Sequence, residues 1–425
     1  MQQKIDGLLV PKLRFPEFWD AGEWEEKPLS RVGEIITGNT PSTANLDNYG
    51  GNRLFVSPAD MSYERYIATT KTTLSEQGFQ ETRPIKANSI LFVCIGSTIG
   101  KIAQNKILCA TNQQINSIVP FIEYSNEFIY SALENSASKI TLLAGNHAVP
   151  IINKTLFSSV LVGFPSLPEQ KKIADCLSSI DDRITLETQK LDTLKAHKKG
   201  LMQQLFPAEG ETMPKLRFPE FQDSGEWEQK RLGELLEFKN GINASKEQYG
   251  KGTKFINVLD ILQNEFITHE KIIGSVDVSD AIANKFSVNY GDILFQRSSE
   301  TQEEVGTANV YLDRKKTATF GGFVIRGKKI AEYEPIFLNK LLKCQSIRNS
   351  ISLKSGGSTR FNIGQETLSS IKIFLPLIPE QQKIADCLSS LDELIAAQTQ
   401  AIDTLKTHKK GLMQQLFPSV DEVKG

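Results

Sequence analysis

The sequence contains few of the residues that would support catalysis, metal binding or cross-linking. Its four histidines (His147, His197, His269 and His408) lie far apart, and none has a partner at the spacing of a metal site. Its five cysteines form no Cys-x-x-Cys pair, and an odd count argues against a disulfide framework. We therefore expect the cysteines to be small buried apolar residues in a reducing cytosol.

The sequence also lacks any signal for a membrane or for export. It has no run of eighteen apolar residues, so we expect no membrane span. The first ten residues contain no long apolar segment of the kind found in a secretory signal. These absences predict a cytoplasmic protein.

Catalytic and cofactor-binding motifs are missing as well. The segment Gly96-Ser-Thr-Ile-Gly-Lys-Ile102 has three residues between its glycines where a nucleotide-binding loop has four. Its Ile102 stands where Ser or Thr would bind magnesium. Neither a Gly-x-Gly-x-x-Gly fingerprint nor the Asn-Pro-Pro-aromatic tetrapeptide of amino-methyltransferases is present. The sequence therefore favours binding over chemistry, with no catalytic residue, metal or cofactor of its own.

The net charge of −1 shows no bulk preference for a polyanion. It does not exclude nucleic acid, because binding depends on the local potential at a surface.

What the sequence does contain is a set of blocks that occur twice, separated by segments that differ. The repeated blocks are Pro-Lys-Leu-Arg-Phe-Pro-Glu-Phe at 11–18 and 214–221, Gly-Glu-Trp-Glu at 22–25 and 225–228, Lys-Ile-Ala-Asp-Cys-Leu-Ser-Ser at 172–179 and 383–390, and Lys-Lys-Gly-Leu-Met-Gln-Gln-Leu-Phe-Pro at 198–207 and 409–418. The period is far longer than that of a solenoid, so the pattern indicates a duplicated domain. Constant blocks around variable middles suggest one scaffold that presents two different binding surfaces.

Two long helices are predicted, one near the end of each repeat. Pro168-Glu169 and Pro379-Glu380 suit the first positions of a helix. Apolar residues then follow a 3-4 spacing for about five heptads, which is typical of a coiled coil. These seam residues are Ile173, Leu177, Ile180, Ile184, Leu191, Leu194, Leu201 and Leu205, and then Ile384, Leu388, Leu391, Ile395, Ile402, Leu405, Leu412 and Leu416. The alternative is a long amphipathic helix packed on a globular core.

Polar residues interrupt this seam at equivalent places in both copies. Glu187 and Gln398 occupy one position, and Lys198 and Lys409 occupy the other. Polar seam residues fix register at a cost in stability. If the helices pair antiparallel, one hypothesis is that Glu187 approaches Lys409; the other is that these positions are solvated. Each helix would be about 55 Å long at about 1.5 Å per residue, which makes the pair a spacer between two domains.

The variable segments are predicted to be mixed α and β. Short strands are expected at 89–95, 160–165, 292–295 and 371–376, and short helices at 128–133 and 337–342. The predicted fold class is therefore α+β or mixed: two α/β domains separated by two long antiparallel coiled-coil helices, with pseudo-twofold internal symmetry. The expected divisions are 11–166 and 214–378 for the two domains, and 167–207 and 379–418 for the helices.

Loops of the variable segments are rich in glycine, amide, hydroxyl and basic residues. Arg pairs bidentately with guanine and Asn or Gln with adenine, whereas Ser, Thr and backbone N–H groups suit phosphate. The alternative is that these loops have no role in binding and are polar only because surface loops usually are. The candidate DNA-binding residues are Asn39, Arg53, Ser97, Thr98, Lys101, Gln113, Gln114, Lys239, Asn240, Arg297, Ser298, Thr359, Arg360 and Asn362.

The repeated motifs resemble those of type I restriction-modification specificity (S) subunits. The helical pattern at 168–206 and 379–417 is specific to that family, and Phe-Pro-Glu-Phe followed by Trp resembles the segment that introduces each of its target-recognition domains. Weaker likenesses are Gly-Asn-Thr-Pro-Ser at 38–42 and Asn112-Gln113. The second variable segment departs from both, with Asn-Gly-Ile-Asn-Ala-Ser at 240–245 and Phe-Gly-Gly-Phe at 320–323.

This resemblance implies a non-catalytic subunit that binds a bipartite site on double-stranded DNA, one half per domain, with a gap set by the helices. It implies two modification (methyltransferase) subunits and restriction subunits as partners. S-adenosylmethionine, ATP and magnesium are expected on those partners only. Two alternatives remain open at this point: a coiled-coil adaptor that binds proteins, and a self-contained methyltransferase or nuclease.

The seam generates a first prediction. Leu194→Asp or Leu405→Asp places a charge among apolar residues and should lower the free energy of unfolding by several kcal/mol. The spacing between the two half-sites recognised on DNA should be disturbed as well. Denaturant unfolding and gap-length selectivity measure the two effects, and unchanged selectivity would contradict the paired-helix spacer.

Overall fold

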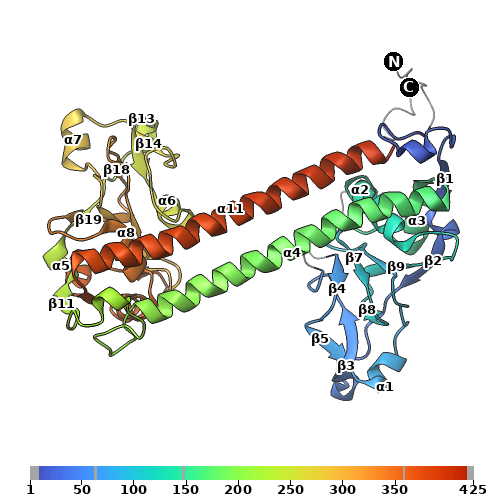
Figure 1. Cartoon of the computed structure of the whole chain (residues 1–425), viewed down its shortest axis with the longest axis horizontal. Coiled ribbons are helices and arrows are strands. Elements are labelled where there is room, and N and C mark those ends of the chain that lie inside the picture. The colour runs from blue at the N-terminus through green and yellow to red at the C-terminus, as the bar shows by residue number, and fades with distance from the viewer. Residues whose placement is uncertain (1–8, 62–64, 146–148, 358, 419–425) are drawn as a thin grey trace. The chain divides into compact units, whose positions relative to one another are not determined.

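The computed structural model describes residues 9–61, 65–145, 149–357 and 359–418, and the chain divides into two compact units. The first unit combines the chain up to Lys190 with the chain from Gln398 onward, and the second contains Leu191–Ala397. Two long helices, α4 (Leu167–Leu205) and α11 (Ile378–Leu416), each contribute one part to each unit. Figure 1 shows both helices as unbroken ribbons, α4 in green and α11 in red.

The first unit is built around a five-stranded sheet with strand order β2-β9-β6-β7-β4. Its strands are β2 (Gly33–Thr37), β9 (Ile115–Pro120), β6 (Ile90–Val93), β7 (Ile102–Asn105) and β4 (Tyr66–Ile67). A smaller sheet contains β5 (Thr72–Leu74), β3 (Tyr49–Val56) and β8 (Ala110–Thr111), and β1 (Glu25–Pro28) pairs with β10 (Leu161–Phe164). In addition to α4 and α11, the first unit contains the helices α1 (Glu76–Gln80), α2 (Asn126–Leu142) and α3 (Lys154–Ser158).

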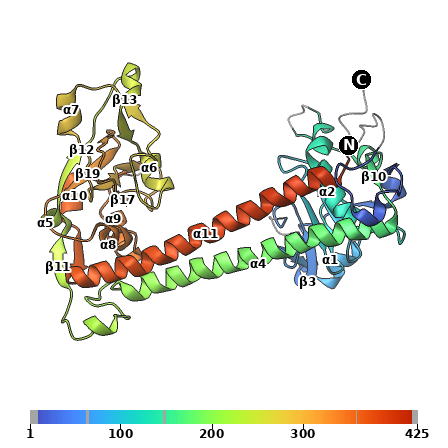
Figure 2. The same ribbon diagram turned by 45° about the horizontal axis from the view of Figure 1, so that its top comes forward.

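The second unit repeats this plan with different lengths. Its main sheet is β12 (Leu236–Asn240), β19 (Val324–Lys329), β15 (Ile293–Gln296) and β17 (Ala308–Val310). The small sheet is β14 (Ser275–Val276), β13 (Tyr249–Ile256) and β18 (Thr319–Phe320), and the ribbons are β11 (Glu228–Arg231) with β21 (Lys372–Leu375) and β16 (Ser298–Ser299) with β20 (Phe361–Asn362). Its helices are α5 (Leu232–Leu235), α6 (Val258–Gln263), α7 (Asp280–Lys285), α8 (Pro335–Leu342), α9 (Gln345–Leu353) and α10 (Gln365–Ser369). Figure 2 shows α8 and α9 beside the beginning of α11.

The mixed α/β prediction and the strands expected from the sequence are confirmed. Pro168 and Pro379 were predicted to begin the two long helices, and the helices begin one residue earlier, at Leu167 and Ile378. The helix α2 is longer than expected and continues to Leu142, because Ile140 lies on its buried face and extends its contact with the core.

The two long helices pair antiparallel, and the residues that the sequence placed at a coiled-coil seam have two different environments. Ile173 and Leu177 of α4 lie in the same core as Leu416 of α11 and the strands of the first unit. Leu205, Ile384 and Leu388 do the same in the second unit. The globular-packing interpretation therefore holds for the ends of both helices, whereas Glu187 and Gln398, nearer their middle, bind each other across the helix pair.

The polar seam residue Glu187 does not approach Lys409, and that hypothesis was wrong. Gln398 Nε2 donates instead to Glu187 Oε2 at 2.6 Å and to the Glu187 backbone oxygen at 3.0 Å. The pKa of Glu187 is lowered chiefly by this side-chain hydrogen bond. Lys409 lies about three helical turns further along α11, and there it pairs with Asp181 and Glu134.

The repeated sequence blocks are the parts that join each domain to the helices. The guanidinium of Arg14 binds both carboxylate oxygens of Glu169 at 2.8 Å, and Arg217 binds Glu380 in the same way at 2.7 Å. Both glutamates are almost completely buried. The Pro-Glu-Gln sequence at each helix start therefore supplies an anion for the arginine of the preceding block.

The glutamine of the same tripeptide fastens the helix to its own domain. Gln170 Nε2 donates to the Pro165 oxygen, and its Oε1 accepts from the Ser125 N–H at the start of α2. Gln381 makes the corresponding bonds to Pro376 and Glu334.

Aromatic residues pack at the C-terminal end of each long helix. Trp24 packs edge-on against Phe417, which follows α11, and Trp227 packs edge-on against Phe206, which follows α4. The backbone N–H of Leu13 donates to Gln415, and that of Leu216 donates to Gln204, both at 2.9 Å. Each introductory block thus contacts the beginning of one long helix and the end of the other.

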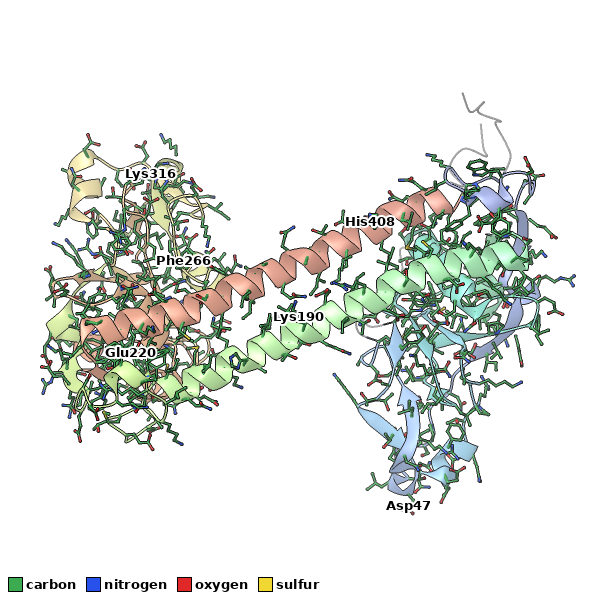
Figure 3. All side chains as sticks on the ribbon, in the orientation of Figure 1. Asp47, Lys190, Glu220, Phe266, Lys316 and His408 are labelled. Carbon is green, nitrogen blue, oxygen red and sulfur yellow. The ribbon has the colours of Figure 1, made fainter. Side chains whose placement is uncertain are left out.

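Figure 3 shows Glu220 beside the beginning of α11, where it pairs with Lys383. The first unit has the equivalent pair, Glu17 with Lys172. These two ion pairs lie at the surface, unlike the buried Arg14–Glu169 and Arg217–Glu380 pairs, and they serve as natural controls for them.

The two buried ion pairs, Arg14–Glu169 and Arg217–Glu380, are called the arginine locks below, and they give a second prediction. Arg14→Ala or Arg217→Ala leaves a carboxylate buried without its cation, and should lower the free energy of unfolding by about 3–5 kcal/mol. Urea unfolding followed by tryptophan fluorescence measures this. Glu17→Gln and Glu220→Gln remove the exposed pairs and should leave the curve unchanged. Equal effects for the two kinds of variant would contradict the assignment of the locks.

Candidate nucleic-acid interface

Three loops of the first unit meet at one end of its main sheet. Strand pairing places Thr37 opposite Asn116 and Val93 opposite Ile115, so β2 and β6 end where β9 begins. The loops that follow β2 and β6 and the loop that precedes β9 therefore lie together. Gly38 permits this close approach, since a Cβ there would be 2.2 Å from the Thr111 oxygen.

Most of the candidate residues of the first unit lie on these loops. Gln113 Oε1 accepts from Thr40, and Gln114 Nε2 donates to the Ile95 oxygen at 3.3 Å, so these contacts join neighbouring loops. Ser97 and Thr98 occupy the turn between β6 and β7, where Ser97 is exposed. Lys101 at the end of this turn donates to the Pro58 oxygen.

Two candidates of the first unit have structural partners. The side chain of Asn39 donates to the Glu81 oxygen and accepts from the Arg83 N–H, which holds the loop after β2 against the end of α1. Arg53 lies apart from the loop group, on β3, where it pairs with Glu76 and stacks over Phe79.

The second unit has the same meeting of strand ends. Asn240 pairs with Ile325 and Gln296 with Val324, so β12 and β15 end where β19 begins. Gly241 takes the place of Gly38, and a Cβ there would be 2.1 Å from the Gly321 oxygen. A glycine at this position in both units lets two loops cross without steric conflict.

A polar groove of about 610 Å³ opens at this end of the second unit. Asn240, Arg297 and Asn362 line it, together with the start of α10. Ser298 pairs with Asn362 across β16 and β20, and its hydroxyl donates to the Asn362 Oδ1. Residues from three segments distant in sequence are thus brought together, and an Asn beside an Arg supplies donors and acceptors for the edges of bases.

The remaining candidates of the second unit, Thr359, Arg360 and Lys239, are not among the residues that line this groove. Thr359 and Arg360 are exposed, and Asn362 Nδ2 donates to the Arg360 oxygen at 3.1 Å. Lys239 neighbours Asn240 on β12, but successive strand residues point to opposite faces. Its Nζ donates to the Lys285 oxygen, and its pKa is lowered by burial and by the cations of Lys285 and Arg326.

The structure adds residues that sequence analysis missed. Gln365 and Thr367 line the groove from α10. Phe323 has 63% of its surface exposed, and its backbone oxygen accepts from the Arg297 N–H. For Phe323, the signal in the sequence was that Phe-Gly-Gly-Phe at 320–323 stands where the first variable segment has Asn112-Gln113. No sequence motif pointed to Gln365 or Thr367.

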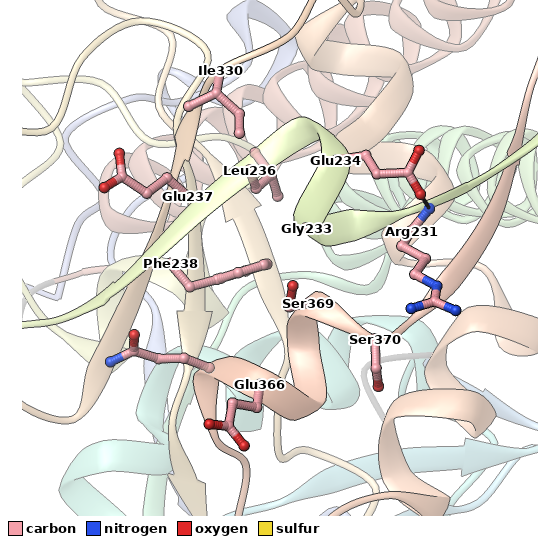
Figure 4. A pocket seen from close by; sticks show the side chains of 11 residues that line it. Arg231, Gly233, Glu234, Leu236, Glu237, Phe238, Ile330, Glu366, Ser369 and Ser370 are labelled. Atoms are coloured by element: carbon pink, nitrogen blue, oxygen red, sulfur yellow. Dashed lines mark hydrogen bonds between the residues drawn. The ribbon is translucent and has the colours of Figure 1, made fainter.

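A second hollow of the second unit, of about 620 Å³, has the wrong charge for nucleic acid. Figure 4 shows it between β12 and α10, with Glu234, Glu237 and Glu366 among its side chains. Arg231 is the single cation that lines it, and its backbone N–H donates to Glu234. Three carboxylates against one guanidinium disfavour a polyanion here.

Among the described residues, no group of His, Cys, Asp and Glu is arranged to hold a metal ion. Cys94, Cys109 and Cys344 are buried, as predicted for small apolar residues, and burial raises the pKa of each thiol to about 12. Cys176 and Cys387 are only partly buried. Within the described ranges, no helix is both long and apolar enough to cross a membrane.

Comparison with known proteins identifies the family. The model of the type I restriction modification DNA specificity domain matches the chain twice, at residues 21–196 and 224–407. The MjaIX specificity subunit of Methanocaldococcus jannaschii is 25% identical over 406 residues, which is 93% of this chain and 92% of that protein. The HindI specificity subunit of Haemophilus influenzae is 36% identical over 168 residues, covering 38% of this chain and 35% of that one.

Solved structures show the same fold. The S subunit of a type I restriction-modification system from M. genitalium superposes with a TM-score of 0.58 at 15% identity, covering 97% of this chain and 100% of that one. A chain from a study of type I restriction-modification assembly gives a TM-score of 0.56 at 18% identity, with coverages of 93% and 98%. With its two matched domains, its repeated blocks and its shared fold, the chain belongs to the type I restriction-modification DNA specificity family.

Proposed function

We propose that the protein is the sequence-specific DNA-recognition subunit of a type I restriction-modification complex. It binds a bipartite site on double-stranded DNA, with one half-site for the domain at 11–166 and the other for the domain at 214–378, and with a gap set by the helices. The observation that carries this proposal is the contrast between identical supports and unlike loops. The same locks hold both domains, yet the strand-end loops present different side chains.

The chemistry is assigned to partner subunits. Two modification subunits would methylate adenine with S-adenosylmethionine, and restriction subunits would use ATP and magnesium for translocation and cleavage. The groove of the second unit is lined by amides, a hydroxyl, an arginine and one carboxylate, that of Glu366. Each of these groups can pair with a base edge, the carboxylate by accepting from the amino group of cytosine. The proposed DNA substrate implies a cytoplasmic location.

Co-expression with the cognate modification subunit tests this function. Single-molecule sequencing of the host DNA should show methyladenine in a split motif with two unlike halves and a fixed gap. Methylation or cleavage by the purified chain alone would indicate a self-contained enzyme. DNA affinity that does not fall with salt would indicate a protein adaptor, because phosphate contacts release counterions and give a steep negative slope.

A third prediction separates the two half-sites. Arg297→Ala combined with Arg360→Ala should weaken and relax recognition of the second half-site only, by roughly 1–3 kcal/mol for each bidentate pair lost. The base preference at each methylated position measures this. An equal loss of preference in both half-sites would contradict the assignment of one domain to each half.

A further inference from the structure

The charged residues of the helix seam form the same ion pair in both units, with the roles of the two helices exchanged. In the first unit, Lys409 of α11 pairs with Asp181 of α4 at 2.6 Å. In the second unit, Lys198 of α4 pairs with Asp392 of α11. The two lysines occupy equivalent positions of the repeat, and so do the two aspartates.

Each domain then adds one cation and one anion to this pair. In the first unit, Arg65 lies 3.3 Å from Asp181, and Glu134 of α2 lies 2.6 Å from Lys409. The Arg65 side chain is only 4% exposed, and it also binds Glu127 and stacks over Tyr130. The result is a quartet of alternating charges, two from the helices and two from the domain.

The second unit has an equivalent quartet. Lys340 of α8 lies 2.5 Å from Asp392, and Glu265 lies 3.5 Å from Lys198. Lys340 also binds Glu265, so the ring of charges is closed. The Lys340 side chain is 2% exposed, even more buried than Arg65 in the first unit.

The domain residues of the two quartets do not correspond in sequence. The packing of Trp24 on Phe128 and of Trp227 on Phe337 aligns α2 with α8. In this alignment Lys340 matches Ser131, and Glu134 matches Lys343. The same charge pattern is therefore built from different domain residues. The helix lysine and aspartate are the members that both quartets share, so we attribute the pattern to the helix pair.

The cause is electrostatic. After a half-buried lysine and aspartate pair with each other, the lysine still has N–H donors and the aspartate still has acceptor lone pairs without partners. Leaving these groups unpaired in a poorly solvated seam raises the free energy of the folded state. Burial raises the pKa of Glu265, but Lys343, Lys340 and Lys198 outweigh it and hold this pKa at about 2. Burial likewise raises the pKa of Glu134, against the opposing effect of Lys409.

We propose that this quartet fixes the orientation of each recognition domain on the helix pair, with Arg65 and Lys340 as positioning residues. A domain fits the helices when it carries one cation for the helix aspartate and one anion for the helix lysine. This inference rests on the proposed function, because the orientation of a domain determines where its half-site must lie on DNA.

Charge reversal in the second unit tests the inference. The helix reversal combines Lys198→Glu with Asp392→Lys and keeps the helix pair intact with opposite polarity. The domain reversal combines Lys340→Glu with Glu265→Lys. All variants carry Lys343→Met, which removes a neighbouring cation that would favour one polarity. The fourth variant contains both reversals and restores alternating charges, so the set forms a double-mutant cycle.

The first measurement needs no DNA. Hydrogen exchange of the α8 amides should become about tenfold faster in each single reversal and return towards the reference rate in the combined variant. Additive losses in the combined variant would overturn the inference, whatever the chain does with DNA.

The second measurement uses the complex with modification subunits and a library of targets that differ in gap length. Each single reversal should methylate targets whose gap differs by one base pair, while the bases preferred in each half-site stay the same. The combined variant should return to a single gap. A uniform loss of methylation at every gap would indicate a merely structural role and overturn the positioning role.

If the reference protein methylates no split target, the proposed function fails. The hydrogen-exchange cycle still decides whether the quartet couples the domain to the helices, so the two failures remain distinguishable.

Discussion

The buried pairing of Arg14 with Glu169, and of Arg217 with Glu380, is the constraint on which the rest of the structure depends. Each arginine belongs to the block that precedes a domain, and each glutamate to the first turn of the helix that follows it. The ion pair therefore holds the N-terminal and C-terminal ends of each domain together. The glutamine next to each glutamate adds backbone bonds from the domain itself, so the closure does not depend on the arginine alone.

This closure explains why the repeated blocks stay alike while the middles differ. The arginine and the glutamate of each lock both belong to sequence that occurs in both repeats. A change of either one would leave a buried charge unpaired. The strand-end loops, at Asn39 and Ser97 in the first unit and at Arg297 and Asn362 in the second, contain none of the lock residues. These loops differ between the two units while the locks are the same in both, which is what two different half-sites require.

The charge quartets show a second form of constraint. The lock is made from repeated sequence on both sides, whereas each quartet joins a repeated helix pair to residues supplied by a variable domain. Arg65 comes from the edge of a sheet and Lys340 from a helix, yet both reach the helix aspartate. Such a partnership is invisible to sequence comparison between the repeats, because the participating positions do not align.

The sequence by itself determined the duplication, the two long helices, the strands that precede them and the absence of recognisable catalytic motifs. These follow from local pattern: helical spacing, prolines and identity between blocks act over short stretches of chain. Only the tertiary structure decided that Glu187 meets Gln398, that Arg53 is held by Glu76 away from the loops, and that Asn240, Arg297 and Asn362 share one groove. The physical reason is that these contacts join residues far apart in sequence, and strand order and helix register, which the local pattern leaves open, determine which of them meet.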